Sequence, residues 1–170
     1  MEELYRRRSI RKYTYKEVKD EDILEIIKAG TYAPSAYHKQ PWSFTIIKEK
    51  AITKNLATFL ANYNEKKGRK SLTPSIIEKA PVVVLIYNNE TIKRDLHILS
   101  LGAMIENMLL KATSLNIGSL WVGVLNDVRE EVNNLLPKDG ELISAVILGH
   151  TEETPVMPKR KDLENLIEWR

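Results

Sequence analysis

The residues best suited to chemistry are two clusters of cations near opposite ends of the chain. Arg6 to Lys12 is a dense basic run with a single hydroxyl, Ser9, and Lys159 to Lys161 is a second basic run near the C-terminus. Guanidinium groups and a hydroxyl can together satisfy a doubly charged phosphate group. A solvated helix end or a nucleic-acid patch would use the same residue types. The residues alone therefore leave these three interpretations open.

Two further stretches have the composition of a ligand site. Ser119 to Leu125, with the sequence SLWVGVL, is expected to be a buried strand, yet it contains Gly123. Strands tolerate glycine poorly unless a backbone or a ligand must come close. The loop from Ala33 to Trp42 contains two prolines and many hydrogen-bonding groups, and it leads directly into a strand. Such a loop is either a surface crossing or a binding segment.

The chain contains no cysteine and only three histidines. The lack of cysteine excludes disulfides, thiolate zinc sites, iron–sulfur clusters and a cysteine nucleophile. His97 and His150 are expected to be packed, structural residues, whereas His38 lies in the proline-bracketed loop. We therefore predict no thiolate nucleophile and no metal ligand.

Bulk composition is that of an ordinary globular protein. With 170 residues, 43% of them hydrophobic and 29% charged, we expect one domain spanning 1–170. The net charge of +3 is mild and does not require a polyanionic partner. The basic N-terminus is not followed by an apolar segment, which favours a cytoplasmic protein.

The element that must position these residues is a long helix at 95–115. Its apolar residues cover nearly every face, so we expect it to pack against its own core and against a second subunit. Its polar interruptions argue against a membrane span. The segment Asn116 to Gly118 is expected to stop the helix, with Gly118 free to take a positive φ. Apolar residues near the C-terminus, such as Leu163 and Trp169, would also need a partner to cover them.

Hydrophobic periodicity predicts the remaining elements. The strands at 80–87 and 142–148 are expected to be central because their apolar runs are continuous. We expect helices at 20–30, 51–67, 75–79 and 127–136, and strands at 43–48, 80–87, 119–125 and 142–148.

Taken together, several segments resemble the FMN-dependent nitroreductase family in type and order. They are Arg7 to Tyr13, the loop from Ala33 to Trp42, Ala80 to Val84, Gly102 to Leu110, Trp121 to Gly123, and the basic tail. The resemblance implies an α+β, nitroreductase-like fold with a mixed central sheet flanked by helices. It also implies an intertwined homodimer that binds FMN at the subunit interface, with the C-terminal extension embracing the other subunit.

The resemblance also implies the cofactor-binding residues. They come from the N-terminal basic run, the proline-bracketed loop, the strand beneath the flavin ring, and the basic tail: Arg7, Arg8, Ser9, Arg11; Pro34, Ser35, Ala36, His38, Gln40; Trp121, Val122, Gly123, Val124; and Lys159, Arg160, Lys161. Family members often have Asn where this chain has His38. The sequence has no clear counterpart of the family's Asn and Lys between the second and third helices.

The implied activity is hydride transfer from NADH or NADPH to the flavin and onward, by a ping-pong mechanism, to a nitroaromatic, a quinone or a related small-molecule acceptor. The cofactor would carry this chemistry, so the resemblance implies no catalytic side chain. Neither nucleic acid nor membrane is an expected partner. Two alternatives stay open: an FMN-storage module without turnover, and a basic nucleic-acid-binding dimer. The sequence has no dinucleotide fingerprint that would choose between NADH and NADPH. The acceptor pocket is expected near Tyr37, Phe59, Tyr63 and residues 66–73.

Overall fold

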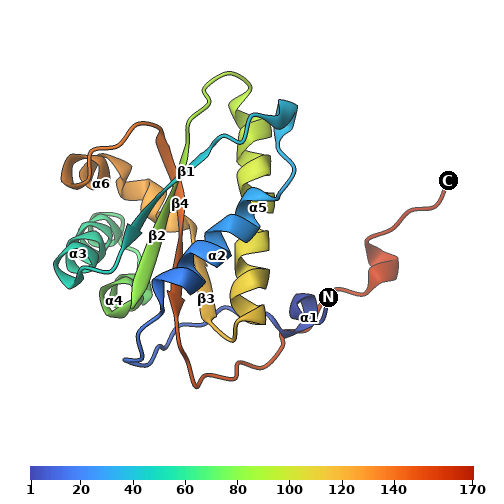
Figure 1. Ribbon diagram of the computed structural model, residues 1–170, viewed down its shortest axis with the longest axis horizontal. Coiled ribbons are helices and arrows are strands. Elements are labelled where there is room, and N and C mark those ends of the chain that lie inside the picture. Colours follow the sequence, from blue (N-terminus) through green and yellow to red (C-terminus); the bar gives the residue numbers. More distant parts are fainter.

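The run of aliphatic residues after Pro81 forms strand β2 (Val82–Asn88), and every residue of this strand is buried. Its neighbours are β1 (Trp42–Ile47) and β4 (Glu141–Gly149), and β3 (Gly118–Val122) completes the sheet in the order β1-β2-β4-β3. The predicted central positions of the second and last strands are therefore confirmed. A computed structural model, which describes all of residues 1–170, provides these coordinates (Figure 1).

The four strands pair antiparallel throughout. The only parallel pairing is an isolated bridge between Ser9 and Ser119, which lies on the outer side of β3. The resemblance implied a mixed sheet, and within this chain that bridge is its one parallel pairing. The bridge places the N-terminal basic run directly beside the strand predicted to lie under the flavin.

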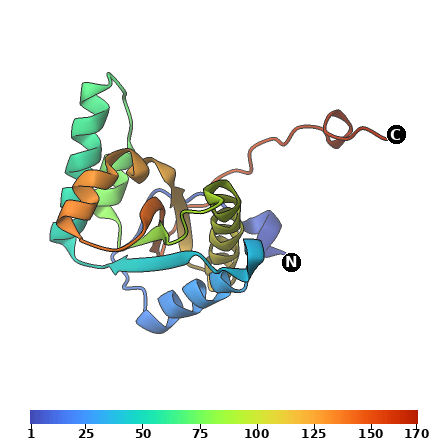
Figure 2. The same cartoon turned by 90° about the horizontal axis from the view of Figure 1, so that it is seen from above.

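Helices cover both faces of the sheet, as Figures 1 and 2 show. One face carries α2 and α5, and the other carries α3, α4, α6 and the 3-10 turn η2. The helical elements are α1 (Glu3–Arg6), α2 (Asp20–Thr31), η1 (Ala36–His38), α3 (Lys50–Lys66), α4 (Thr73–Lys79), α5 (Arg94–Ser114), η2 (Gly123–Val128), α6 (Arg129–Leu135) and η3 (Leu163–Asn165).

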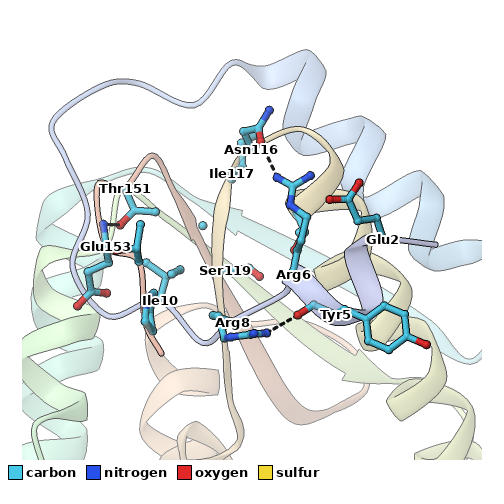
Figure 3. A pocket seen from close by; sticks show the side chains of 14 residues that line it. Glu2, Tyr5, Arg6, Arg8, Ile10, Asn116, Ile117, Ser119, Thr151 and Glu153 are labelled. Carbon is cyan, nitrogen blue, oxygen red and sulfur yellow. Dashed lines mark hydrogen bonds between the residues drawn. The ribbon is translucent and has the colours of Figure 1, made fainter. Parts of the chain in front are cut away.

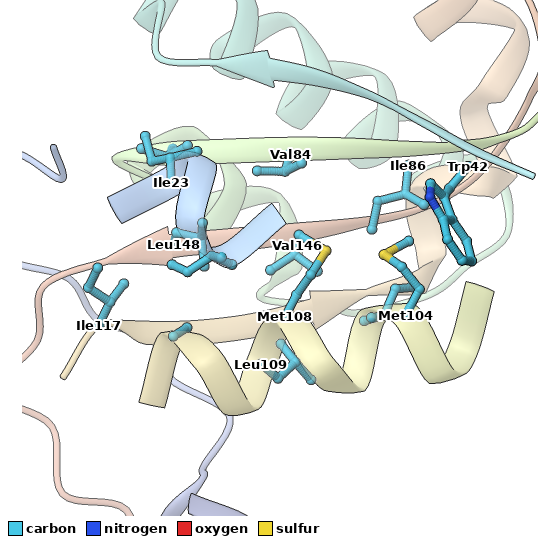
Figure 4. Close-up of a cluster of buried hydrophobic side chains, with 14 of the residues drawn as sticks. Ile23, Trp42, Val84, Ile86, Met104, Met108, Leu109, Ile117, Val146 and Leu148 are labelled. Atoms are coloured by element: carbon cyan, nitrogen blue, oxygen red, sulfur yellow. The ribbon is translucent and has the colours of Figure 1, made fainter. Parts of the chain in front are cut away.

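Alternation along the strands divides the core into two clusters. On β2, Val84 and Ile86 face α5, whereas Val83 and Leu85 face the layer of α3 and α4. Figure 4 shows the first cluster, where Met104 and Met108 of α5 lie under β2 and β4. Because successive side chains of a strand point to opposite faces, a continuous apolar run supplies both cores.

The long helix α5 begins and ends within one residue of its predicted limits. The helix stops at the predicted segment Asn116 to Gly118, but Gly118 does not take the positive φ, so that detail of the prediction was wrong. Asn116 takes the left-handed conformation with φ of 55°, and the Ile117 amide donates back to the Ala112 carbonyl at 2.9 Å. Asn tolerates this conformation, so Asn116 and not Gly118 supplies the left-handed residue that closes the helix.

The strand prediction around Gly123 was also partly wrong. Strand β3 ends at Val122, and Gly123 is the first residue of η2. The last pair of the β3–β4 ladder is Val122 with Ala145, and the Ser144 hydroxyl donates to the Val122 carbonyl at 3.1 Å. Gly123 and Val124 therefore lie in the turn that leaves the strand.

The C-terminal tail extends away from the body of the molecule (Figures 1 and 2). Every residue from Val156 to Arg170 is exposed. Its apolar side chains contact no core, and Trp169 is 91% exposed. None of the helices combines the length and the apolar character that crossing a bilayer requires.

Candidate functional site

The N-terminal basic run follows α1 as an extended segment along the free edge of β3. The Ile10 amide donates to the Ser119 carbonyl at 2.9 Å, and the Tyr13 hydroxyl donates to the Ile10 carbonyl at 2.8 Å. Burial raises the pKa of Tyr13 above its ordinary value, and the nearby carboxylate of Glu153 raises it further. These contacts fix the backbone from which Arg7, Ser9 and Arg11 project.

The two arginines at the start of this segment carry unsatisfied donors. The Arg7 Nε atom lies 3.3 Å from Glu106 Oε1, which is close enough for an ion pair, but the geometry does not make a hydrogen bond. The Arg8 Nη1 atom donates to the carbonyls of Tyr5 at 2.7 Å and of Arg7 at 2.6 Å. The Nε atoms of both arginines are buried without a hydrogen-bond partner. A buried donor of this kind is costly unless an acceptor reaches it.

Arg11 is exposed, and its position is fixed through its backbone. Its amide and that of Lys12 donate to Glu153 Oε2 at 2.8 Å and 3.0 Å. Its guanidinium reaches only the Ser9 carbonyl, at 3.2 Å, and has no carboxylate partner within 4.0 Å. A cation is therefore presented at the edge of β3.

A cavity of about 680 Å³ lies beside this segment (Figure 3). It includes Arg6 and Arg8, and the Arg6 guanidinium donates to Asn116 Oδ1 at 3.1 Å. Its other walls come from α1, the C-terminal end of α5, the start of β3 and the segment 151–155 that follows β4. Among the predicted cofactor residues, only Arg8 lines it. Arg8 is therefore the one residue that belongs both to the wall of this cavity and to the predicted flavin site.

The predicted floor of the site is formed by β3 and the turn after it. Trp121, in the strand that was expected to be buried, is 44% exposed, and its indole Nε1 donates to Ser144 Oγ at 2.7 Å. Its ring edge faces Gly102 of α5, where an added Cβ would lie 3.9 Å from it. Nothing lies within 4 Å of the position that a Cβ on Gly123 would take. Val122 is buried, whereas Gly123 and Val124 are exposed, so open space lies above this turn.

The proline-bracketed loop lies at the N-terminal end of α5. The Ala36 amide donates to Ser100 Oγ at 3.0 Å, and the Gln40 amide donates to Ser35 Oγ at 3.0 Å. The side chains of Gln40 and His38 approach each other at 3.2 Å. Pro34, His38 and Gln40 are exposed. The loop therefore presents its polar groups outward from a fixed backbone.

The structure does not bring all predicted site residues together within one chain. Lys159, Arg160 and Lys161 line a shallow depression of their own on the tail, with none of the N-terminal arginines among its walls. Of the residues expected at the acceptor pocket, Tyr63 is on α3 and Tyr37 is in η1, and these elements lie on opposite sides of the sheet in Figure 1. A single chain therefore supplies separate parts of the site.

Sequence reasoning missed the polar residues that orient these groups. Glu106 and Ser100 on α5, and Ser144 on β4, each contact a predicted site residue. On α5 they appear in the sequence as interruptions of an apolar helix. A polar residue on an otherwise buried face was the available signal, because such a residue needs a partner.

This chain is similar to one protein family and to several known proteins. A family model described as "Nitroreductase family" matches residues 4–150. An Archaeoglobus fulgidus protein assigned as an NADH dehydrogenase/NAD(P)H nitroreductase is 28% identical over 159 residues, covering 88% of this chain and 84% of that protein.

Two crystal structures are similar over nearly the whole chain. A BluB-like flavoprotein from Clostridium difficile 630 has a TM-score of 0.88 and 27% identity, covering 99% of this chain and 97% of that one. A protein from Desulfovibrio desulfuricans, assigned as a nitroreductase and in complex with FMN, has a TM-score of 0.82 and 26% identity, covering 99% of this chain and 95% of that one.

Proposed function

The chain belongs to the nitroreductase family, and on this premise we propose that it is an FMN-dependent oxidoreductase. It takes hydride from NADH or NADPH and reduces nitroaromatic, quinone or related acceptors. The solved relative in complex with FMN and the relative named for NAD(P)H nitroreductase support this assignment. We take residues 1–170 as one domain, and a cytoplasmic location stays a prediction.

The observation that carries the proposal is the pair of orphaned guanidinium donors at Arg7 and Arg8. A phosphate monoester carries nearly two negative charges at neutral pH and three acceptor oxygens. It can satisfy several buried donors at once, whereas a neutral group cannot balance the charge of two arginines. Arg7, Arg8 and Ser9 would therefore hold the FMN phosphate.

The open turn at Gly123 supports a flat ligand at the other end of the same strand. No side chain occupies the space above it, and the exposed face of Trp121 continues the surface. Trp121, Val122, Gly123 and Val124 would form the floor under the isoalloxazine ring. Arg11, which is held at the same edge through Glu153, would stabilise negative charge that the ring acquires.

Bound FMN would supply the redox chemistry, accepting hydride from the donor and returning it to an acceptor that takes the donor's place, which is a ping-pong cycle. The side chains bind and orient the reactants and limit water access. They need no nucleophile or general base, so we propose no catalytic side chain.

We propose that the protein acts as a homodimer with FMN at the seam. The outer face of α5 exposes large apolar residues, including Leu99 at 72% exposure, and the tail exposes Trp169. Covering both surfaces against a second copy would remove them from water. It would also allow Pro34, Ser35, Ala36, His38 and Gln40 of one chain, and the basic tail with Lys159, Arg160 and Lys161, to complete a site that one chain leaves divided.

Anaerobic spectroscopy of the purified protein tests the function. The protein should be yellow, NADH or NADPH should bleach the flavin absorbance, and a nitroaromatic or a quinone should restore it. A yellow protein that neither donor bleaches would be a storage module and would contradict the proposal. A colourless protein that binds DNA with strong salt dependence would favour the nucleic-acid alternative instead.

A further inference from the structure

Left-handed backbone is concentrated at one corner of the molecule. Five non-glycine residues have positive φ, and four of them lie in the loop around η1 or directly against it: Tyr37 (56°), His38 (55°), Gln40 (47°) and Lys93 (53°). Side chains disfavour this conformation, so it persists where surrounding contacts impose it. Such strain is found most often at functional sites.

Three hydrogen bonds hold the loop around η1 in place. Ser35 Oγ accepts from the Gln40 amide, and Ser100 Oγ on α5 accepts from the Ala36 amide, both at 3.0 Å. The Asn89 amide donates to the Pro41 carbonyl at 2.7 Å. The loop is therefore fixed to α5 and to the end of β2.

Lys93 is the one cation here without a carboxylate partner. Lys39 pairs with Glu90 at 3.7 Å, and Arg94 pairs with Glu141 at 2.7 Å and reaches Asp95 at 4.0 Å. The Lys93 ammonium has no carboxylate within 4.0 Å. It stands 4.3 Å from the centroid of the Tyr37 ring and hydrogen-bonds to the Tyr37 hydroxyl.

The Lys93–Tyr37 pair holds a charge in place without neutralising it. The ring face attracts the ammonium, and the hydroxyl accepts from it, so the side chain keeps one position while its full charge faces solvent. Both residues are exposed, with Tyr37 at 66%. Lys93 is also the capping residue of α5, so the positive end of that helix adds to the local potential.

We propose that Lys93, positioned by Tyr37, determines specificity by receiving an anionic group, a carboxylate or a phosphate, of the molecule that exchanges hydride with the flavin. The inference rests on the proposed function, because the loop that carries Tyr37 is the one expected to reach the flavin. The negative group can belong to the acceptor or to the NADH or NADPH donor. The chemistry recognised is the same, and the two sources are separable by experiment.

The acceptor arm compares two substrates that differ mainly in charge, 4-nitrobenzoate and 4-nitrobenzamide. In the FMN-loaded protein, Lys93→Asn should lower kcat/KM for the benzoate by up to about fivefold, the upper end for one solvent-exposed ion pair, and leave the benzamide unchanged. Asn is chosen because it tolerates positive φ. Lys93→Arg should retain most of the preference, and Lys39→Asn, which removes a cation already paired with Glu90, should have no effect.

The donor arm measures the rate at which NADH or NADPH bleaches the flavin in anaerobic stopped flow. A slower rate at low donor concentration in Lys93→Asn, with an unchanged acceptor preference, would assign the anionic group to the donor and support the proposal. The proposal is overturned if both arms match the unsubstituted protein, or if benzoate and benzamide reduction fall equally. Normal bleaching and normal benzamide reduction in the unsubstituted protein show that the proposed function stands even if the inference fails.

Discussion

Single residues decide whether a dianion can be held at the edge of β3. Two buried Nε donors, on Arg7 and Arg8, have no hydrogen-bond partner, and Glu106 lies near one of them without satisfying it. The Glu106 carboxylate also places a negative charge beside the proposed phosphate site. The attraction between the two arginines and the phosphate must therefore outweigh the repulsion from Glu106. Loss of either arginine should for this reason weaken phosphate binding strongly.

Substituting Arg7 tests the phosphate assignment directly. Arg7→Gln should weaken FMN binding about tenfold, the scale of one lost charge-assisted hydrogen bond, and leave riboflavin binding nearly unchanged. Fluorescence titration of the apoprotein with each flavin measures the ratio. Arg129→Gln, an exposed arginine at the first position of α6 that pairs with Glu141 at 3.4 Å, is the matched control. Equal losses for FMN and riboflavin would show that Arg7 does not contact the phosphate.

Substituting Gly123 or Gly149 by alanine distinguishes a glycine needed for flavin binding from one needed for packing. A Cβ on Gly149 would lie 2.6 Å from Tyr13 Cδ1 and 2.7 Å from Pro81 Cγ, so Gly149→Ala should cost about 1–3 kcal/mol of unfolding free energy. Gly123→Ala meets no atom within 4 Å and should leave Tm unchanged but weaken flavin binding. Thermal denaturation and flavin titration of both variants check this. A Gly123→Ala protein with unaltered flavin affinity would remove this turn from the site.

At the scale of elements, the sequence predicted most of the architecture because burial enforces it. The all-buried β2 and the long α5 were predictable because their apolar patterns have a single compact solution. The end of β3 was not, because it depends on a hydrogen bond from Ser144, a residue 22 positions from Val122 in the chain. The same holds for the candidate site, whose segments were predictable although their orienting partners Glu106, Ser100 and Ser144 were not.

The extended N-terminal segment should show a distinctive pH dependence through Tyr13. Its folded-state pKa is raised, mainly by burial, so the neutral form is favoured in the native state. The stability that this shift contributes is fully present below the unfolded pKa of about 10. As the pH rises above that value, the free energy of unfolding falls by up to about 1.4 kcal/mol per pH unit. Denaturant unfolding between pH 9 and pH 11 should show a shallower decline for Tyr13→Phe. Parallel declines would contradict the buried, neutral state of the hydroxyl.

At the scale of the whole molecule, one chain leaves the site divided. The tail carries four cations and several apolar side chains away from the body, and it buries none of them. Apolar surface of this kind is unusual on a monomer. A second copy of the chain would cover the exposed tail and the exposed face of α5. It would also bring the basic tail of one chain close to the N-terminal basic run of the other.

Removing the tail tests that explanation. A chain ending at Val156 should keep its far-UV circular dichroism, because no residue of the deleted segment is buried. It should dissociate into monomers in sedimentation velocity and lose its FMN. The matched control changes only charge: Lys159→Gln with Lys161→Gln should keep the dimer and weaken FMN more than riboflavin. A truncated protein that stays dimeric and binds FMN normally would exclude the tail from the interface and the site.

The central claim is that cations from both ends of the chain meet on FMN at a two-subunit seam. Titration of the apoprotein with FMN, followed by sedimentation equilibrium and flavin absorbance together, tests it most directly. We predict a dimer that binds two FMN molecules and binds riboflavin much more weakly. A monomer that takes up no FMN, even in excess, would contradict the account.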